Sequence, residues 1–445
     1  MYELDQIRNK ILQGNTLDIL KKLPDECIDC AITSPPYWGL RSYLPDGHPN
    51  KAKEIGLEPT LDLYLDHLLE IMKELKRVLK KTGIIFWNHG DCYGGSGCGK
   101  GDYRNNNKRS LSNPNLYCEK PNPQLTLTPK CMVLQNYRFI LRCVDELGLI
   151  LRNVIIWYKP NHMPSPVKDR FTLSYEPVFM LVKNRNYWFD LDAVRLPHKE
   201  SSRKRVLRAV SNKHKYLNHP EYSGGGGINK PRPNRRKLSI KFSELFDKPD
   251  REYHREQNMT FSQYQYAEGD YLVVNLHPLG ANPGDVWTIP TQPFPEAHFA
   301  TFSEKLVEPM IKAGCPRWIC KKCGKLRERI VKSEKVGDSQ KRGGYIVGGD
   351  GVYTGNVYRI PYKHAKKEFV GWTDCGCGVG WESGIVLDPF GGSGTVGIVA
   401  EKLGRNSILI DLNKEYCEMA YKRLKSVAAQ VKLGEEPSII ERVGF

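Results

Sequence analysis

The segment from residue 384 to Asp411 constrains the fold more than any other part of the sequence. Residues 384–387 are mostly apolar and lead into Asp388-Pro389-Phe390-Gly391-Gly392-Ser393-Gly394-Thr395, a glycine-rich run typical of a tight turn. A helix is predicted over 396–403 and a second strand over 407–410, ending at Asp411. Glycines let the backbone approach a ligand, and an acid at the end of the next strand can hold ribose hydroxyls. The segment therefore predicts a nucleotide-type binding unit, with a purely structural turn as the alternative.

The rest of the sequence alternates strands and helices in the same way. Short apolar runs predict strands at 28–33, 83–87, 154–158 and 178–182. Apolar residues at helical spacing predict a helix over 61–81, and further helices are expected near 133–147 and over 413–429. This alternation predicts an α/β fold with a mostly parallel central sheet.

Lysine and arginine outnumber the acidic residues by 67 to 50, which gives a formal net charge of +17. The excess is concentrated between Lys199 and Lys237, in a polar stretch with weak periodicity. Such a segment favours binding to a polyanion, because neutralised phosphates release counterions. A solvated charged surface is the alternative. A chain of 445 residues also predicts two or three domains.

The sequence carries no membrane or export signal. It has no run of about 18 apolar residues, and Met1-Tyr2-Glu3-Leu4-Asp5 lacks the charged-then-apolar pattern of a signal peptide. We therefore expect a cytoplasmic protein without membrane contact. In that reducing compartment, clustered cysteines are better interpreted as metal ligands than as disulfides.

Two cysteine pairs stand out among the thirteen cysteines. Cys320 with Cys323, and Cys375 with Cys377, supply four thiolates, the usual set for structural zinc. Cys315 is a candidate substitute ligand, and unpaired thiols on a loop are the alternative. The residues between the pairs are polar and glycine-rich, so a metal would explain how such a segment holds its shape. We expect a structural or DNA-positioning role for this site.

The loop Ser34-Pro35-Pro36-Tyr37 follows the strand predicted at 28–33. Its two prolines stiffen the chain, which a turn without further function could also use. Ser34 Oγ and a proline carbonyl can accept hydrogen bonds from an exocyclic amine. Tyr37 and Trp38 offer flat faces on which an extruded base can stack.

Together, Thr33-Ser34-Pro35-Pro36-Tyr37-Trp38 and Asp388-Pro389-Phe390-Gly391-Gly392-Ser393-Gly394-Thr395 resemble the catalytic and cofactor motifs of the amino-group DNA methyltransferases. The catalytic motif comes first, which resembles the permuted β-type order of that family. Four further stretches are similar to the family: Leu12-Gln13-Gly14-Asn15, Asn153-Val154-Ile155-Ile156-Trp157, Val167-Lys168-Asp169-Arg170 and His298-Phe299-Ala300-Thr301-Phe302. The resemblance implies a circularly permuted, Rossmann-like methyltransferase fold.

The same resemblance implies roles for individual residues. The catalytic set is Ser34, Pro35, Pro36 and Tyr37. The residues expected to bind S-adenosylmethionine are Asn15, Thr301, Phe302, Asp388, Phe390, Gly392, Ser393, Gly394, Thr395 and Asp411. The family often has aspartate where this chain has Asn15, so the contact of that residue with the cofactor carries no charge.

The resemblance also implies a division of the chain and a reaction. Residues 1–196 are expected to form the catalytic half, 286–312 with 384–445 the cofactor-binding half, 197–285 a basic target-recognition insertion, and 313–383 a zinc-binding insertion. The expected reaction moves a methyl group to the exocyclic amine of a flipped base in double-stranded DNA. Ser34 at the head of the motif favours cytosine N4, with adenine N6 as the alternative.

Other functions remain open at this point. They are an RNA methyltransferase and a non-catalytic, zinc-containing DNA-binding protein on a methyltransferase scaffold. A dehydrogenase is disfavoured because the glycine spacing is not Gly-x-Gly-x-x-Gly. We further expect the protein to lie at the nucleoid as a monomer or dimer. A cognate restriction endonuclease is a candidate partner.

Overall fold

The computed structural model describes residues 2–39, 42–44, 47–94, 128, 130–165, 167–200, 239–241, 271–273, 280–292, 303–336, 364–431 and 442–443. The chain divides into two compact units. The first comprises Met1–Ala193, Gly284–Leu326 and Cys375–Phe445, and the second comprises Val194–Pro283 and Arg327–Asp374. The predicted 313–383 insertion is thus shared between the units, with all four paired cysteines in the first.

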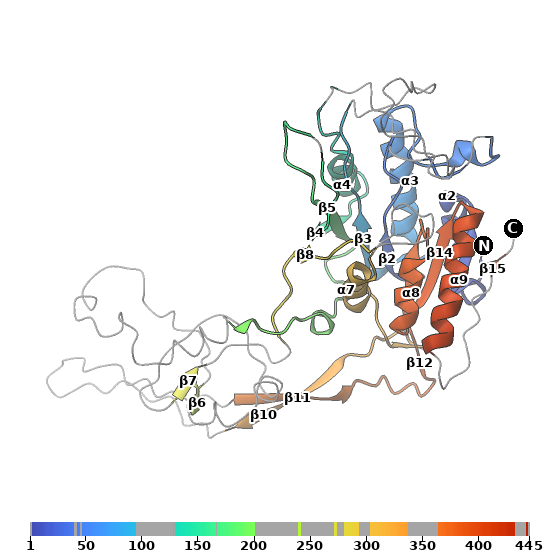
Figure 1. Ribbon diagram of the computed structural model, residues 1–445. Coiled ribbons are helices and arrows are strands. Elements are labelled where there is room, and N and C mark those ends of the chain that lie inside the picture. The colour runs from blue at the N-terminus through green and yellow to red at the C-terminus, as the bar shows by residue number, and fades with distance from the viewer. Residues whose placement is uncertain are drawn as a thin grey trace, which may run out of the picture. The chain divides into compact units, whose positions relative to one another are not determined.

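A nine-stranded sheet forms the centre of the first unit, in the order β15-β1-β14-β13-β2-β3-β5-β4-β8 (Figure 1). Neighbouring strands are parallel except where β5 pairs with β3 and β4. This arrangement confirms the predicted α/β fold with a mostly parallel sheet. The strands are β1 (Lys10–Gln13), β2 (Ile28–Thr33), β3 (Leu79–Asn88), β4 (Ile150–Tyr158), β5 (Tyr175–Val182), β8 (Val286–Thr288), β13 (Ile385–Asp388), β14 (Asn406–Asp411) and β15 (Arg442–Val443).

Helices cover both faces of this sheet (Figure 1). On one face, α2 (Thr16–Leu20), α3 (Leu61–Val78) and α4 (Gln135–Asp145) share a core with sheet residues such as Ala31 and Ile85. On the other, α7 (Glu304–Gly314), α8 (Thr395–Lys402) and α9 (Lys414–Val431) share a second core with residues such as Cys30 and Ile84. Successive strand residues point to opposite faces, so one buried strand serves both cores.

The remaining elements are shorter. The first unit also contains α1 (Leu4–Ile7), two 3-10 turns (Lys51–Lys53 and Leu191–Ala193), and the antiparallel pair β9 (Ile319–Cys320) and β12 (Trp381–Glu382). The second unit contains the antiparallel pairs β6 (Ser239–Lys241) with β7 (Tyr271–Val273), and β10 (Arg329–Val336) with β11 (His364–Trp372). Most of the predicted basic insertion at 197–285 lies outside the described residues.

The helix predicted over 61–81 differs from α3 at its C-terminal end. The helix ends at Val78, and Leu79 begins β3 by pairing with Ile28 of β2. Leu79 is buried in the core, so the apolar spacing continues through it whether the backbone is helical or extended. Pairing with β2 therefore decides the boundary, which local periodicity does not reveal.

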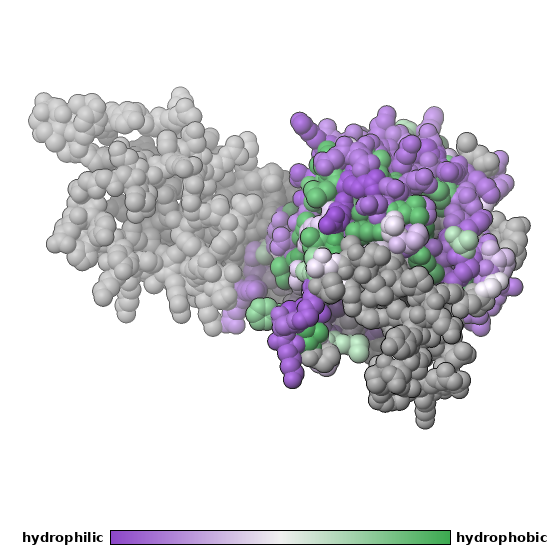
Figure 2. Space-filling model, turned by 90° about the horizontal axis from the view of Figure 1, so that it is seen from above, coloured by the Kyte–Doolittle hydropathy of each residue, from purple (hydrophilic) through white to green (hydrophobic). Residues whose placement is uncertain are grey.

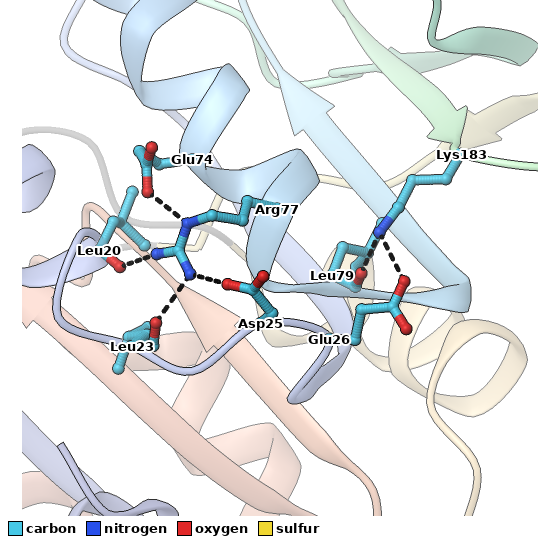
Figure 3. Close-up of polar contacts among 8 residues, drawn as sticks. All are labelled: Leu20, Leu23, Asp25, Glu26, Glu74, Arg77, Leu79 and Lys183. Carbon is cyan, nitrogen blue, oxygen red and sulfur yellow. Dashed lines mark hydrogen bonds and ion pairs between the residues drawn. The ribbon is translucent and has the colours of Figure 1, made fainter. Parts of the chain in front are cut away.

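Arg77 fastens the end of α2 to the end of α3. Its guanidinium donates to the backbone oxygens of Leu20, at 2.7 Å, and Leu23, at 2.9 Å, and it pairs with Glu74 and Asp25 (Figure 3). These bonds join the C-terminal end of α2 and the turn that follows it to the last turn of α3. Because α2 starts directly after Asn15, this clamp also fixes the position of that residue.

Figure 2 shows hydrophilic residues over much of one face, with hydrophobic residues gathered in patches between them. Among the helices that the structure describes, none has the length and apolar character needed to cross a membrane.

Candidate active site

The carboxyl ends of the parallel strands meet at one edge of the sheet. β1 leads there into Asn15, β2 into the Ser34–Tyr37 loop, β13 into the glycine-rich loop, and β14 ends there at Asp411. Such an edge is where open α/β sheets bind ligands. The loops surround a cavity of about 900 Å³.

Most of the predicted catalytic and cofactor-binding residues line this one cavity: Asn15, Ser34, Pro35, Pro36, Tyr37, Asp388, Phe390, Gly392, Ser393, Thr395 and Asp411. Gly394 is not part of the lining. It caps α8 with a φ of +79°, and a Cβ there would lie 2.8 Å from Ala420 Cβ. Thr301 and Phe302 lie outside the described residues.

Two carboxylates, the buried Asp388 and the half-buried Asp411, hold the loops after β13 and β14 in place. Asp388 accepts hydrogen bonds from Thr33 Oγ1 at 2.7 Å and from the Phe390 backbone at 3.1 Å. Asp411 accepts from the backbone nitrogens of Gly392, at 2.8 Å, and Asn413, at 2.7 Å. Burial raises the pKa of Asp388 to about 7, with a smaller contribution from Asp411, and burial raises the pKa of Asp411 to about 6. The cavity floor is therefore suited to a ligand that brings positive charge or hydroxyl donors.

Asn15 caps the N-terminal end of α2. Its side-chain oxygen accepts a hydrogen bond from the Asp18 backbone at 3.1 Å. Asparagine and aspartate are both favoured at this position, so the exchange of aspartate for Asn15 preserves the local structure. The amide nitrogen is the polar group that this side chain has left for a ligand in the cavity.

The Ser34–Tyr37 loop contacts a charged pair formed by Glu176 on β5 and Lys159 directly after β4. Ser34 Oγ lies 3.4 Å from Tyr37 Oη, which lies 3.3 Å from Glu176 Oε2. Glu176 pairs with Lys159 at 2.5 Å, and the Lys159 ammonium lies 4.1 Å from the centre of the Trp157 ring. Burial, together with the Glu176 carboxylate, raises the pKa of Tyr37 well above its usual value, so the phenol stays protonated.

Lys159 and Glu176 also line the cavity, although no sequence motif marks either residue. Lys159 directly follows β4, whereas Glu176 lies near the start of β5. Because β5 is antiparallel to its neighbours, its start meets their carboxyl ends. The signal that could have found this pair is the direction of β5, which strand-and-helix alternation does not give.

A second cluster is formed by the paired cysteines. The sulfur atoms of Cys320, Cys323, Cys375 and Cys377 all lie within 4.8 Å of one another. The pairing of β9 with β12, which sets Cys320 opposite Trp381, brings the two ends of this segment together. Cys315 does not belong to the cluster: it is buried elsewhere, against Gly384 and Pro316. The predicted substitute ligand is therefore not among the residues that the structure assembles.

Comparison with known proteins identifies related chains. The model of the DNA methylase family matches residues 28–318 and 381–422. The Type II methyltransferase M.SfiI of Streptomyces fimbriatus is 29% identical over 458 residues, covering 91% of this chain and 88% of the relative. The Type II methyltransferase M.Cfr9I of Citrobacter freundii is 28% identical over 430 residues, covering 97% and 89%.

Among solved structures, the cytosine-N4-specific PvuII DNA methyltransferase aligns over 96% of this chain and 93% of its own, at 14% identity and a TM-score of 0.42. That likeness is too slight to add to the family match. The match itself spans most of the chain, including both loops at the cavity, and shows that this chain belongs to the DNA methylase family.

Proposed function

We propose that this chain transfers the methyl group of S-adenosylmethionine to the exocyclic amine of a flipped base in double-stranded DNA, with cytosine N4 as the favoured target. The observation that carries the proposal is the meeting of two loops in one cavity. Thr33 and Ser34 are consecutive, yet the Thr33 side chain bonds Asp388 on the cofactor side while Ser34 lines the cavity beside Tyr37. The membership of the DNA methylase family supports the same reaction.

The cavity suits S-adenosylmethionine by its chemistry. Asp411, at the end of β14, is placed to accept from ribose hydroxyls, as acids at this position do in nucleotide-binding sheets. Asp388 and Phe390 would hold the methionine side, Asn15 would offer its amide, and Gly392, Ser393 and Thr395 complete the wall. Thr301, Phe302 and Gly394 complete the proposed binding set. When bound, the cofactor supplies a methyl group on a sulfonium, which is a good leaving group.

The protein's contribution to the reaction is positioning. The lone pair of the target amine is delocalised into the ring, and it becomes nucleophilic when both N–H groups are held out of that plane. Ser34 Oγ and the Pro35 carbonyl are the proposed acceptors, and Tyr37 stacks on the extruded base. Alignment of this kind can supply roughly 7–11 kcal/mol of the barrier.

The choice of base rests on Ser34. A neutral hydroxyl at the head of the motif favours cytosine N4, by the resemblance of Ser-Pro-Pro-Tyr to the motif of cytosine enzymes. Adenine N6 is the alternative. By the names of the relatives, which are Type II methyltransferases, we also propose a role in restriction–modification beside a cognate endonuclease, at the nucleoid.

The cysteine cluster is proposed to hold a structural zinc ion. Four thiolates around tetrahedral zinc, with Zn–S distances of about 2.3 Å, lie roughly 3.8 Å apart, and the four sulfurs observed fall within 4.8 Å. The ion would join β9 to the segment that carries Cys375 and Cys377. We propose that the zinc-binding insertion at 313–383 and the basic target-recognition insertion at 197–285 position DNA. Residues 1–196 are proposed to form the catalytic half, and residues 286–312 with 384–445 the cofactor-binding half.

Mass spectrometry of nucleosides tests the proposed reaction directly. The purified protein is incubated with duplex DNA and isotope-labelled S-adenosylmethionine, and label is expected in N4-methylcytosine. Label in N6-methyladenine keeps the mechanism and overturns the base. Label only in folded RNA, or none on mixed genomic DNA with cofactor binding intact, contradicts the proposal and favours the RNA or the non-catalytic alternative.

Cofactor affinity is expected to fall as the pH falls below about 7. The bound cofactor favours ionised carboxylates at Asp388 and Asp411, whose pKa values in the free protein are raised to about 7 and about 6. Protonation of Asp388 alone predicts a dissociation constant about tenfold weaker at pH 6 than at pH 8. Titration calorimetry from pH 5.5 to 8.5 measures this dependence.

The control for this titration is Asp388→Asn, which is expected to bind more weakly but with a flatter pH profile. The two raised pKa values also make the ligand-free protein less stable as the pH rises from about 4 to 7, because the unfolded chain releases these protons first. Thermal stabilisation by the cofactor should therefore grow over the same range. An affinity independent of pH in the wild-type protein would contradict the proposed ionisation.

A further inference from the structure

Three fully buried side chains form a hydrogen-bonded chain behind the Ser34–Tyr37 loop. Trp87 Nε1 lies 3.4 Å from His89 Nδ1, His89 Nε2 lies 3.0 Å from Tyr64 Oη, and Tyr64 Oη lies 2.8 Å from the Pro36 carbonyl. None of the three side chains is exposed to solvent. Buried polar groups stay bonded, because a broken bond leaves one of them without a partner.

The direction of this chain can be worked out from both ends. An indole N–H only donates, so His89 Nδ1 must accept from Trp87 and carries no proton. A carbonyl only accepts, so the single hydroxyl proton of Tyr64 must point to Pro36. Tyr64 oxygen then accepts from His89, and Nε2 must carry the proton. Both ends of the series therefore require the same neutral tautomer of His89, with the proton on Nε2 and none on Nδ1.

The local environment favours that neutral tautomer. Burial lowers the pKa of His89 to about 3 and raises the pKa of Tyr64 well above its usual value. A second proton on the ring would set a donor at Nδ1 against the donor of Trp87. The direction of these hydrogen bonds is therefore fixed while His89 is neutral, which with a pKa of about 3 includes neutral pH.

The same residues support the ring of Tyr37. The ring centres of His89 and Tyr37 lie 5.4 Å apart with a 32° tilt. Beside them, a Cβ on Gly90 would lie 2.7 Å from Tyr37 Cε2, so the backbone itself packs against the ring. The end of β3 thus fixes both the Pro36 carbonyl and the Tyr37 side chain.

We propose that Tyr64 and His89 are positioning residues for methyl transfer. They engage the Pro36 carbonyl and thereby leave the carbonyl of Pro35, to which no group in the described part of the chain donates, as the acceptor for the target amine. This inference rests on the proposed methyl transfer and deepens it. Neither residue lines the cavity, so both act through the loop.

Single-turnover methylation tests the proposal. Tyr64→Phe removes the bond to Pro36 and is expected to slow methyl transfer about tenfold, since misplacement of reacting groups is costly. His89→Leu should slow it to a similar extent, while His89→Gln, which keeps a donor near the Nε2 position, should stay within about threefold of wild type. Dissociation constants for cofactor and DNA should not change.

The double variant Tyr64→Phe with His89→Leu should be no slower than the worse single variant, because both act through one bond. The matched control is Tyr187→Phe, which loses a hydroxyl bonded to Arg152 at 3.0 Å and lies away from the cavity. It should react at the wild-type rate.

Nitrogen NMR of ¹⁵N-histidine-labelled protein supplies a readout that does not depend on activity. The His89 signals, identified by their loss in His89→Gln, should show a proton on Nε2 and no titration between pH 5 and 8. A proton on Nδ1 would contradict the proposed direction of the hydrogen bonds from Trp87 to Pro36. A wild-type protein that methylates no DNA overturns the proposed function, whereas an active wild type with an equally fast Tyr64→Phe variant overturns only the positioning role.

Discussion

Replacing Ser34 with alanine is expected to lower the rate of methyl transfer by roughly 10²–10³-fold, the cost of losing one preorganised hydrogen-bond partner of the reacting group. Ser34 lines the cavity, and among the described residues its hydroxyl bonds within its own loop, to Tyr37. Its hydroxyl is not among the groups that donate to Asp388 or Asp411 in the described part of the chain. The affinity for S-adenosylmethionine should therefore stay within about twofold of wild type. Rapid-quench kinetics and calorimetry on the same preparation measure the two quantities.

The neighbouring residue provides the matched control. Thr33→Val removes the 2.7 Å hydrogen bond to Asp388 and leaves a buried carboxylate oxygen with one partner fewer. Its main effect should be on cofactor affinity, by about tenfold. If one substitution lowers mainly the rate and its neighbour lowers mainly the cofactor affinity, the two results together support separate roles for the proposed catalytic loop and the proposed cofactor loop. If Ser34→Ala lowers the rate of methyl transfer and the affinity for S-adenosylmethionine equally, the result contradicts the proposed role of Ser34 as an acceptor for the target amine.

Loss of the proposed zinc ion is expected to have the other large effect. Structural zinc sites contribute about 10–16 kcal/mol of binding free energy, which is coupled to folding. Cys323→Ser, at the exposed position of the cluster, should abolish stoichiometric zinc, measured by elemental analysis, and make the segment between the cysteine pairs sensitive to protease. DNA affinity should fall, whereas cofactor affinity should not, because none of the four cysteines lines the cavity.

Cys131→Ser is the control, because Cys131 is also exposed and does not belong to the cluster. It should retain any bound metal and protease resistance. A wild-type protein that is purified under reducing conditions and carries no zinc, and takes up none, would contradict the proposed site.

Much of the fold could be predicted from the sequence, because local pattern and sheet pairing agree in most elements. β2 has the predicted bounds of 28–33. The glycine-rich loop joins a strand to a helix as expected, because only a turn with positive φ at Gly392 and Gly394 makes that connection so short. The end of α3 was predicted wrongly, since the pairing of Leu79 with Ile28 depends on a distant strand.

The candidate site was predictable where its residues carry a motif, and not where they are brought in by the fold. Ser34 and Asp388 belong to recognisable loops, but their meeting depends on the adjacency of β2 and β13. No sequence motif marks Lys159, Glu176, Tyr64 or His89. A tyrosine on the apolar face of a helix is most simply interpreted as a core residue, and its hydroxyl acquires a role only when Pro36 lies within reach.

The order of strands also has a consequence for how the molecule is made. β14 and β13 lie between β1 and β2, although Asp388 of β13 is 355 positions from Thr33 of β2. On the ribosome, β1 and β2 emerge long before the strands that separate them. Until those strands arrive, both present unpaired backbone edges of the kind that template aggregation. We expect those edges to stay open until late in synthesis, and the cavity, which residues of the loop after β13 line, cannot form until β13 is inserted.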